Sequence, residues 1–187
     1  MRTQERFLDA SAEEFARHGY AGANLQRISA QAGMTKGALY GHFSSKDALA
    51  AVFTSAFDAG WRELFRKIGD GDPPLAILHR VTVGFVHRMH GDLRFRAGLR
   101  LVYEEASARD TAPQAVTDLT AELTRLVAAA QDRSELAATH SPEVIASMFL
   151  SLMFGMYYTA PTDTSSAHST RQVCQVWQLL ESRHTAA

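Results

Sequence analysis

The residues best suited to chemistry lie in one short segment, KGALYGHF, at positions 36–43. Leu39 and Phe43 stand four residues apart and would face inward on a helix. The outward residues are small or carry hydrogen-bond donors: Lys36, Gly37, Ala38, Tyr40 and His42. Small residues let a backbone come close to bases, and Lys, Tyr and His side chains donate to phosphate oxygens. The segment therefore indicates a surface for nucleic acid and not a catalytic centre.

Two short helices around a tight turn would position this segment. The first helix carries small and apolar residues at helical spacing: Leu25, Ile28, Ser29 and Ala32. Asn24 stands where an N-cap belongs and Thr35 can cap the second helix, while Gly33 supplies the positive φ with which a chain often leaves a helix. A helix, a glycine-containing turn and a second short helix form the helix-turn-helix plan, whose second helix enters the major groove of DNA.

The segment AGMTKGALYGHFSSKDAL resembles the DNA-binding signature of the TetR family of transcriptional regulators, and the resemblance extends over about residues 3–55. It implies DNA contacts by Thr35, Lys36, Gly37, Ala38 and Tyr40, and phosphate contacts by His42 and Lys46. Many members carry a Thr or Ser pair where this chain has Ala23 and Asn24. Asparagine can still cap, so Asn24 and Arg27 complete the predicted DNA-binding residues. The alternative is an ordinary helical hairpin of a bundle. Such a hairpin would not require this pattern of glycine, lysine, tyrosine and histidine residues.

The composition is that of a globular protein with a modest charge asymmetry. The net charge of the 187 residues is −1. Residues 1–46 carry six Arg and Lys against four acids, which gives +2, so the remainder carries −3. This asymmetry favours an N-terminal part that faces DNA. The charged N-terminus does not look like a secretory signal, and one cysteine, Cys174, cannot form an internal disulfide, so we expect a cytoplasmic protein.

Helical periodicity predicts an all-α fold of about nine helices. Beyond the hairpin, the expected helices cover residues 3–18, 44–68, 73–90, 93–108, 113–131, 142–159 and 168–183. We expect a three-helix DNA-binding domain at residues 1–46 and a helical-bundle domain for ligand binding and dimerisation at 47–187. The 44–68 helix, with Ser44 and Asp47 in a capping-box arrangement, would act as a lever between the two.

Residues 144–162 contain no charged side chain and are long enough to span a bilayer. Serines, a glycine and the lack of a basic flank argue against this, so we expect a buried helix and no membrane partner. The resemblance implies that the helices at about 142–159 and 168–183 pair with their counterparts in a homodimer. Dimerisation would also help recognition of DNA. One short helix contacts few base pairs, whereas a two-fold dimer contacts two half-sites.

Aromatic and methionine side chains are numerous in the C-terminal region. Such residues at helical spacing form a core more often than a pocket, but the resemblance implies an apolar cavity for a small effector. The candidate ligand-binding residues are Trp61, Phe65, Phe85, Met89, Leu99, Tyr103, Phe149, Leu152, Met153 and Met156. We interpret Arg96, Arg100 and Glu104, which stand four residues apart, as a solvated salt-bridge ladder. Alternatively, these three residues are polar groups at the mouth of the pocket.

The segment GDLRFRAGLRLVYEEA is similar to the γ-butyrolactone receptors of actinomycetes, in which an R-A-G-x-R-L segment recurs. Those receptors usually carry a Trp, which lines the lactone pocket, shortly after the Pro that opens the next helix. Here the residues after Pro113 are QAVTDLTAEL, without a Trp. A lactone and a different effector therefore both remain open.

No catalytic set, cofactor site or metal site emerges from the sequence. His87 and His90 lack a third ligand at a suitable spacing. We therefore predict a ligand-responsive repressor, not an enzyme, that binds double-stranded, near-palindromic operator DNA as a dimer and is released by a small apolar effector. The alternatives are a helical small-molecule-binding or enzymatic protein with a vestigial DNA-binding head, and an activator in place of a repressor.

Overall fold

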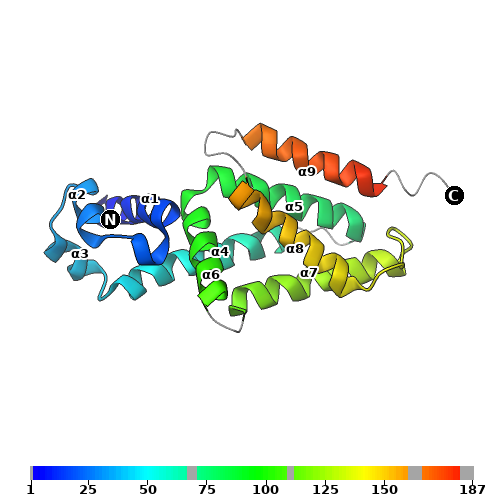
Figure 1. Ribbon diagram of the computed structural model, residues 1–187, viewed down its shortest axis with the longest axis horizontal. Coiled ribbons are helices and arrows are strands. Elements are labelled where there is room, and N and C mark those ends of the chain that lie inside the picture. The colour runs from blue at the N-terminus through cyan, green and yellow to red at the C-terminus, as the bar shows by residue number, and fades with distance from the viewer. Residues whose placement is uncertain (1, 67–70, 109–111, 160–165, 182–187) are drawn as a thin grey trace. The chain divides into compact units, whose positions relative to one another are not determined.

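The computed structural model describes residues 2–66, 71–108, 112–159 and 166–181, and within these ranges every regular element is an α-helix (Figure 1). In chain order these are α1 (Arg2–Gly22), α2 (Leu25–Gln31), α3 (Lys36–His42), α4 (Lys46–Arg66), α5 (Pro74–Gly91), α6 (Leu93–Ala108), α7 (Gln114–Asp132), α8 (Pro142–Thr159) and α9 (Ser166–Glu181). The predicted all-α class is confirmed.

Packing divides the chain into two compact units, and each is described here by itself. The head unit comprises Met1–Gly60 and Asp92–Val116, so α6 packs with the N-terminal helices. The bundle unit comprises Trp61–Gly91 and Thr117–Ala187. The border between the units therefore falls within α4, and the functional division after residue 46 stays a prediction.

Aromatic residues from α1 and α4 form the centre of the head unit. Phe15 and Phe53 are fully buried and meet edge to face, with ring centroids 5.6 Å apart. Other buried members of this core are Phe7, Ile28, Leu39 and Leu49, and α6 adds Ala97 and Leu101. Burial of one large apolar side chain contributes roughly 1.5–3 kcal/mol. This core can therefore hold α2 and α3, which are too short to be stable alone in water.

Helix α6 lies close against α4 at Gly98. A Cβ atom on Gly98 would collide with the carbonyl oxygen of Phe53 and would lie 2.8 Å from the Cβ atom of Phe57. Phe57 itself packs on Phe95 of α6, with ring centroids 5.0 Å apart. Because only glycine fits this contact, Gly98 sets the spacing of α4 and α6.

Two helix boundaries near glycine and proline differ from the sequence prediction. The first helix was expected to end before Gly19, and this residue does break the helical geometry, at φ 66° and ψ −171°, but helical turns resume up to Gly22. Helix α5 begins at Pro74, one residue later than predicted. The carbonyl oxygen of Pro73 accepts the N–H of Ile77 at 3.0 Å, so Pro73 takes the flanking position.

The start of α4 also corrects the predicted capping box. The hydroxyl of Ser45 accepts the N–H of Ala48 at 3.0 Å, so Ser45 caps this helix in place of Ser44. The serine pair left the choice open, because either residue can accept from a backbone N–H three positions on. Residues 67–68 of the expected long helix lie outside the described ranges.

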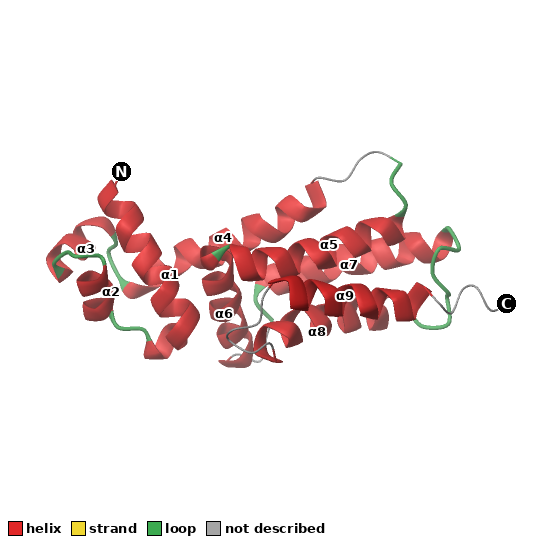
Figure 2. Ribbon diagram, turned by 90° about the horizontal axis from the view of Figure 1, so that it is seen from above, coloured by secondary structure: helices red, strands yellow, loops and turns green. Residues whose placement is uncertain are grey.

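Buried aromatic side chains also hold the bundle unit together. Trp177 of α9 stacks on Phe149 of α8 with ring centroids 5.1 Å apart, and its indole N–H donates to the hydroxyl of Thr82 on α5 at 2.9 Å. Helices α5, α8 and α9 lie side by side in Figure 2. Across the described ranges, no helix has both the length and the apolar character needed to cross a membrane. Residues 160–162 of the uncharged stretch fall outside these ranges.

Candidate nucleic-acid interface

Helix α3 presents a polar face and is anchored from its other side. The hydroxyl of Thr35 accepts the N–H of Ala38 at 3.2 Å and caps the helix as predicted. Leu39 is fully buried and Phe43, which ends the helix, is 6% exposed, whereas Tyr40 is 46% exposed. Lys36, Gly37 and His42 are exposed, and Ala38 is half-buried. The inward and outward faces are those expected from the sequence except at Ala38, which packs partly against the core of the head unit.

The turn between α2 and α3 is built on Gly33. Its φ is 69°, which confirms the predicted positive φ at this position. The N–H groups of Gly33 and Met34 donate back to the carbonyl oxygens of Ala30 and Ser29 at 3.0 and 2.9 Å. A Cβ atom on Gly33 would also lie 2.7 Å from the guanidinium of Arg6. Both the backbone and the neighbouring side chain thus require glycine.

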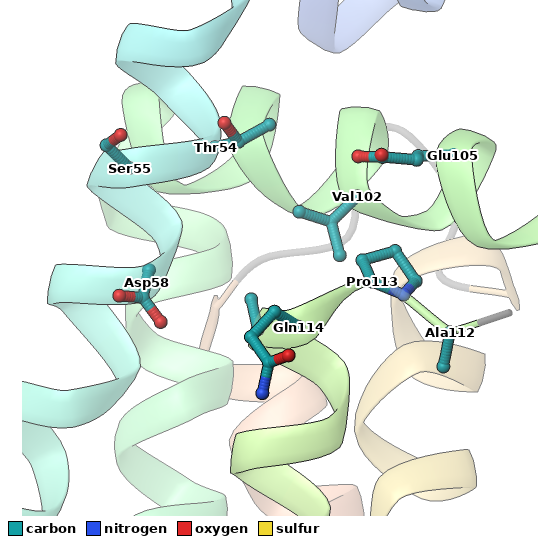
Figure 3. Close-up of a pocket in the computed structure, with 9 residues that line it drawn as sticks. Thr54, Ser55, Asp58, Val102, Glu105, Ala112, Pro113 and Gln114 are labelled. Atoms are coloured by element: carbon teal, nitrogen blue, oxygen red, sulfur yellow. The ribbon is translucent and has the colours of Figure 1, made fainter.

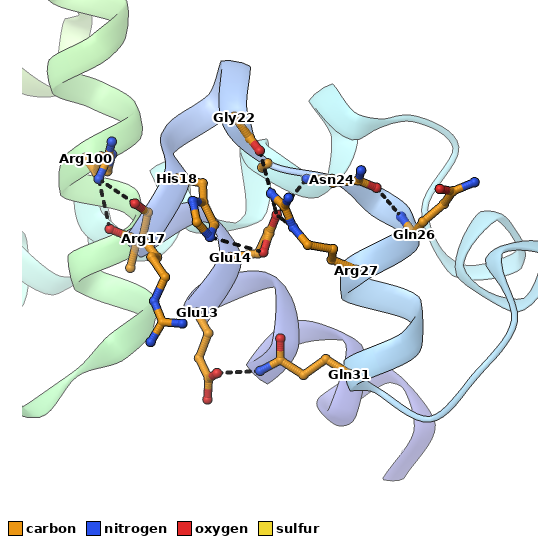
Figure 4. A network of polar contacts seen from close by, with 12 residues as sticks. Glu13, Glu14, Arg17, His18, Gly22, Asn24, Gln26, Arg27, Gln31 and Arg100 are labelled. Atoms are coloured by element: carbon orange, nitrogen blue, oxygen red, sulfur yellow. Dashed lines mark hydrogen bonds and ion pairs between the residues drawn. The ribbon is translucent and has the colours of Figure 1, made fainter.

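A buried carboxylate fixes α2 on α1 (Figure 4). Glu14 is 5% exposed, and its Oε1 atom accepts from Arg27 Nε at 2.8 Å, Arg27 Nη2 at 2.5 Å and the Asn24 N–H at 2.8 Å. Burial alone raises the pKa of this carboxyl, but the bonds from Arg27 and Asn24 outweigh it and hold the pKa below its ordinary value. The side chain of Asn24 accepts the Gln26 N–H at 2.8 Å, which confirms the predicted N-cap.

Lys46 has partners inside the head unit as well. Its ammonium donates to the carbonyl oxygen of Ala23 at 2.7 Å and lies 4.7 Å from the ring centroid of Tyr20. The Tyr20 hydroxyl donates to Asp47, and this bond raises the pKa of the phenol. Lys46 and Arg27 stay predictions as DNA contacts, and the structure gives both a part in holding the head unit together.

Sequence reasoning missed Glu14 as a residue of the site. The available signal was its position, because Phe7, Ser11 and Glu14 stand at i, i+4 and i+7 on one face of α1, and all three are buried. A carboxylate on the buried stripe of an amphipathic helix requires a cationic or hydrogen-bonding partner. The partner, Arg27, lies 13 residues further along the chain, and no local pattern connects the two.

Helix α6 binds the first half of α1 through an arginine. Arg94 donates to the carboxylates of Glu5 and Asp9 at 2.5 and 2.9 Å, and these two bonds raise the pKa of the guanidinium. All three side chains are partly exposed, so each ion pair contributes at most about 1 kcal/mol. The shared guanidinium nevertheless fixes the register of α6 on α1.

A second pair on α6 binds the chain around Gly19. Arg100 donates to the carbonyl oxygens of Ala16 and Arg17 at 3.2 and 3.1 Å (Figure 4). Glu104 accepts from Arg100 Nε at 2.9 Å and from the Tyr20 N–H at 2.7 Å. The expected ion pair between Arg100 and Glu104 is therefore present. Its two members also satisfy backbone groups at the kink, where the regular helical bonds of α1 are interrupted.

The candidate ligand-binding residues divide between the two units. Leu99 and Tyr103 belong to the head unit, and the other eight belong to the bundle unit: Trp61, Phe65, Phe85, Met89, Phe149, Leu152, Met153 and Met156. Five of the ten are at most 1% exposed: Trp61, Phe85, Leu99, Phe149 and Met153. Their part in ligand binding stays a prediction. An effector that binds among them would have to displace packed side chains.

A pocket of about 480 Å³ lies in the head unit between α4, α6 and the start of α7 (Figure 3). Thr54, Ser55 and Asp58 line it from α4, and Val102 and Glu105 line it from α6. A second pocket of about 500 Å³ shares Thr54 and Glu105 with the first. Among the described lining residues of both pockets, none belongs to the predicted ligand-binding set.

One of the two histidines considered as metal ligands has a different neighbour. His90 Nε2 lies 2.9 Å from the hydroxyl of Ser169 on α9. Within the part of the chain that the structure describes, no three His, Cys, Asp or Glu side chains are grouped so that they could hold a metal ion.

Comparison with known proteins gives this arrangement a family. Residues 7–52, which contain α2, α3 and Glu14, match the family model described as bacterial regulatory proteins, tetR family. The A-factor receptor protein of Streptomyces griseus is 29% identical over 183 residues, which cover 95% of this chain. The N-terminal segment of this chain therefore matches the TetR family of transcriptional regulators. The chain spans 62% of the length of the A-factor receptor protein.

Solved structures resemble this chain over nearly its whole length. A γ-butyrolactone receptor described as ArpA-like has a TM-score of 0.80 and 27% identity, over 95% of this chain and 85% of that one. The TetR-family protein CprB of Streptomyces coelicolor, solved with its operator sequence, has a TM-score of 0.78 and 27% identity, over 95% and 86% of the two chains. The similarity therefore extends well beyond the matched N-terminal segment.

Proposed function

We propose that this TetR-family chain is a ligand-responsive transcriptional repressor that binds a near-palindromic operator as a homodimer and leaves it when a small apolar effector binds. The observation that carries the proposal is the exposed polar face of α3, presented by a helix whose other face is buried. An α-helix with small and hydrogen-bonding residues outward suits the major groove of DNA.

Within this proposal the exposed residues of α3 make the DNA contacts. Lys36, Tyr40 and His42 donate to phosphates, while Gly37 and Ala38 let the backbone come close to the bases. Thr35 lies at the N-terminus of α3, beside the same surface. The residues Asn24, Arg27 and Lys46 flank this face, and their bonds inside the head unit orient it. The operator-bound structure of the CprB relative supports this kind of docking.

The proposed homodimer forms through α8 and α9. Val144 and Met148 on α8 are large apolar residues that are 60% and 44% exposed, and Ser147 and Ser151 beside them are exposed as well. Apolar side chains exposed together on one helix favour burial against a partner. Two copies joined at this face would present two α3 helices to the two half-sites of a palindrome.

The proposed effector is small and apolar, and it binds among the aromatic and methionine residues of the bundle unit. Methionine side chains adapt their shape, so Met89, Met153 and Met156 suit a cavity that opens on binding. Two relatives, the A-factor receptor protein and a γ-butyrolactone receptor, make a lactone the first class to test. The effector must bind the released form more tightly, because a ligand shifts an equilibrium only by its differential affinity.

The test is fluorescence anisotropy of the purified protein on labelled DNA from upstream of its own gene. We expect specific binding whose affinity falls steeply with salt, and release by at least one γ-butyrolactone. Specific binding that no lactone reverses would retain the repressor and remove that ligand class. Equal affinity for the upstream DNA and an unrelated duplex would contradict the repressor and favour a small-molecule-binding protein with a vestigial head.

A second assay tests the proposal that the chain is a regulator and not an enzyme. The relatives named above are regulators and receptors. We expect a lactone that releases the DNA to be recovered unchanged after prolonged incubation with the protein. Hydrolysis of the ring at a rate above that in buffer, measured by mass spectrometry, would contradict this part of the proposal.

A further inference from the structure

Tyr20 lies at the kink of α1 and contacts two other helices of the head unit. Its backbone follows Gly19, where the helical geometry of α1 is broken, and its side chain is 37% exposed. Three parts of this residue have a partner: the backbone N–H, the hydroxyl and the face of the ring. An aromatic side chain that is fixed both at its backbone and at its hydroxyl has one orientation, so its ring can hold a neighbouring group in place.

The backbone of Tyr20 is bound to α6. Its N–H donates to Glu104 at 2.7 Å, and Glu104 also accepts from Arg100 Nε at 2.9 Å. Arg100 in turn donates to the carbonyl oxygens of Ala16 and Arg17, which precede the kink. Because these bonds lie on both sides of the kink, α6 determines where the side chain of Tyr20 begins.

The hydroxyl of Tyr20 is bound to the start of α4. It donates to Asp47, the second residue of that helix and the direct neighbour of Lys46 in the chain. The bond raises the pKa of the phenol, so the hydroxyl stays protonated and remains a donor at neutral pH. The far end of the Tyr20 side chain is therefore fixed to the same helix that carries Lys46.

The ring of Tyr20 lies under the ammonium of Lys46. The Nζ atom is 4.7 Å from the ring centroid, within the roughly 6 Å over which a cation is attracted to an aromatic face. The same ammonium donates to the carbonyl oxygen of Ala23 at 2.7 Å. An ammonium has three N–H donors, and the bond to Ala23 uses one of them. The long and flexible lysine side chain is thus held in one place while it retains donors for a further acceptor.

We propose that Tyr20 is a positioning residue for DNA binding, which presents the ammonium of Lys46 to a phosphate of the DNA backbone. This inference rests on the proposed function, in which Lys46 flanks the DNA-contacting face of α3. A lysine that is already held in place loses less side-chain freedom when it binds a phosphate, so the ring strengthens binding without touching DNA. Because Glu104 binds the backbone of Tyr20, α6 is connected to this DNA contact through one residue.

The test compares Tyr20→Leu, Tyr20→Phe and Lys46→Ala with the parent chain by fluorescence anisotropy over a range of salt concentrations. The slope of the logarithm of affinity against the logarithm of salt concentration reports how many phosphates are neutralised. Tyr20→Leu removes the ring, so we expect about two- to fivefold weaker DNA binding and a salt slope lower by about 1, as in Lys46→Ala. Tyr20→Phe retains the ring and should retain the salt slope of the parent.

A double variant separates positioning of Lys46 from a general effect on the head unit. If Tyr20 acts through Lys46, Tyr20→Leu should cause no further loss of DNA affinity in a chain that already carries Lys46→Ala. The same loss in both backgrounds, or an unchanged salt slope in Tyr20→Leu, would indicate a merely structural role and overturn the proposal. Val52→Ala is the control, because Val52 lies on α4 with a similar exposure, 36%, and its replacement should leave affinity and salt slope unchanged.

The salt slopes are measured on the upstream DNA and on an unrelated duplex, because phosphate contacts carry no sequence information. A parent chain with equal affinity for both duplexes would contradict the proposed repressor, and the slopes would still decide the role of Tyr20. Specific binding by the parent, with the same slope in Tyr20→Leu, would overturn the role of Tyr20 alone. A parent that binds neither duplex would overturn both. Circular dichroism and thermal unfolding show that each variant is folded.

Discussion

The guanidinium of Arg27 donates two hydrogen bonds to one oxygen of Glu14, from Nε at 2.8 Å and from Nη2 at 2.5 Å. The same oxygen accepts the N–H of Asn24, the N-cap residue of α2. One buried carboxylate therefore fixes both the start and the side of α2. Because the turn to α3 follows directly, the orientation of α3, the proposed DNA-contacting helix, depends on this contact.

Replacement of Glu14 by glutamine tests that dependence. Glu14→Gln keeps the size of the side chain but removes the charge that the two bonds from Arg27 assist, so we expect a loss of about 1–3 kcal/mol in the free energy of unfolding. Urea denaturation measures it. Glu13→Gln is the matched control, because Glu13 is exposed and should change stability by less than about 0.5 kcal/mol. Equal effects of the two variants would contradict the special position of Glu14.

The pH dependence of stability follows from the lowered pKa of Glu14. A carboxyl whose pKa is lower in the folded than in the unfolded chain stabilises the fold above the unfolded pKa, about 4.3 for glutamate. That contribution is lost as the pH falls through the folded value. We expect the free energy of unfolding to decrease below about pH 4.3, and the decrease to be smaller in Glu14→Gln. Identical pH profiles of parent and variant would refute this assignment.

The contact at Gly98 predicts a large effect of one methyl group. Gly98→Ala places a Cβ atom against the carbonyl oxygen of Phe53, which is backbone and cannot turn aside. We expect a destabilisation of roughly 1–3 kcal/mol or more from overpacking. Gly91→Ala is the control, because no atom lies within 4 Å of its added Cβ. In thermal unfolding, we expect the melting temperature of Gly98→Ala to lie well below that of the parent chain and that of Gly91→Ala to lie close to it.

Two lysines of the head unit should differ in what they contribute. Lys36 is exposed on α3, so Lys36→Ala should weaken operator binding and lower its salt slope by about 1, with stability unchanged. Lys46 donates to the carbonyl oxygen of Ala23, so Lys46→Ala should lower stability by about 1 kcal/mol as well as operator affinity. Anisotropy over a range of salt concentrations, together with urea denaturation, separates the two effects. A stable Lys46→Ala protein would show that the contact with Ala23 contributes little.

The hydroxyl of Tyr40 should matter more to DNA binding than to the fold. Tyr40 is 46% exposed, so Tyr40→Phe should leave thermal stability within the error of the measurement. The loss of one hydrogen bond to a phosphate, about 1 kcal/mol, corresponds to about fivefold weaker operator binding. Unchanged affinity would mean that this hydroxyl faces solvent in the complex.

Local signals predicted the elements of the DNA-facing hairpin well. Asn24 and Thr35 cap α2 and α3, and Gly33 has positive φ, because each of these features depends only on the residue and its immediate neighbours. The choice between Ser44 and Ser45 as the cap of α4 could not be made, because both satisfy the same local rule. Ser45 is the cap in the structure.

Contacts between distant segments could not be predicted in the same way. The bonds of Glu14 to Arg27 and of Arg100 to the carbonyl oxygens of α1 join residues that only the folded chain brings together. For the same reason, the sequence placed Leu99 and Tyr103 in one set with residues of the bundle unit, whereas packing assigns them to the head unit. The ten candidate ligand-binding residues stay a prediction, since the sequence does not distinguish core from cavity.

The position of α6 in the head unit limits how the chain can be divided. The N-terminal helices bury Phe53 and Phe57 against a helix that follows them by more than thirty residues, with Gly98 fitted to their backbone. A fragment that ends at Gly60 would lack this cover and the bonds that Arg94 and Arg100 make to α1. The first three helices, which carry the proposed DNA contacts, are therefore not a portable module. A hybrid regulator made by exchanging them must also carry an α6 that matches them.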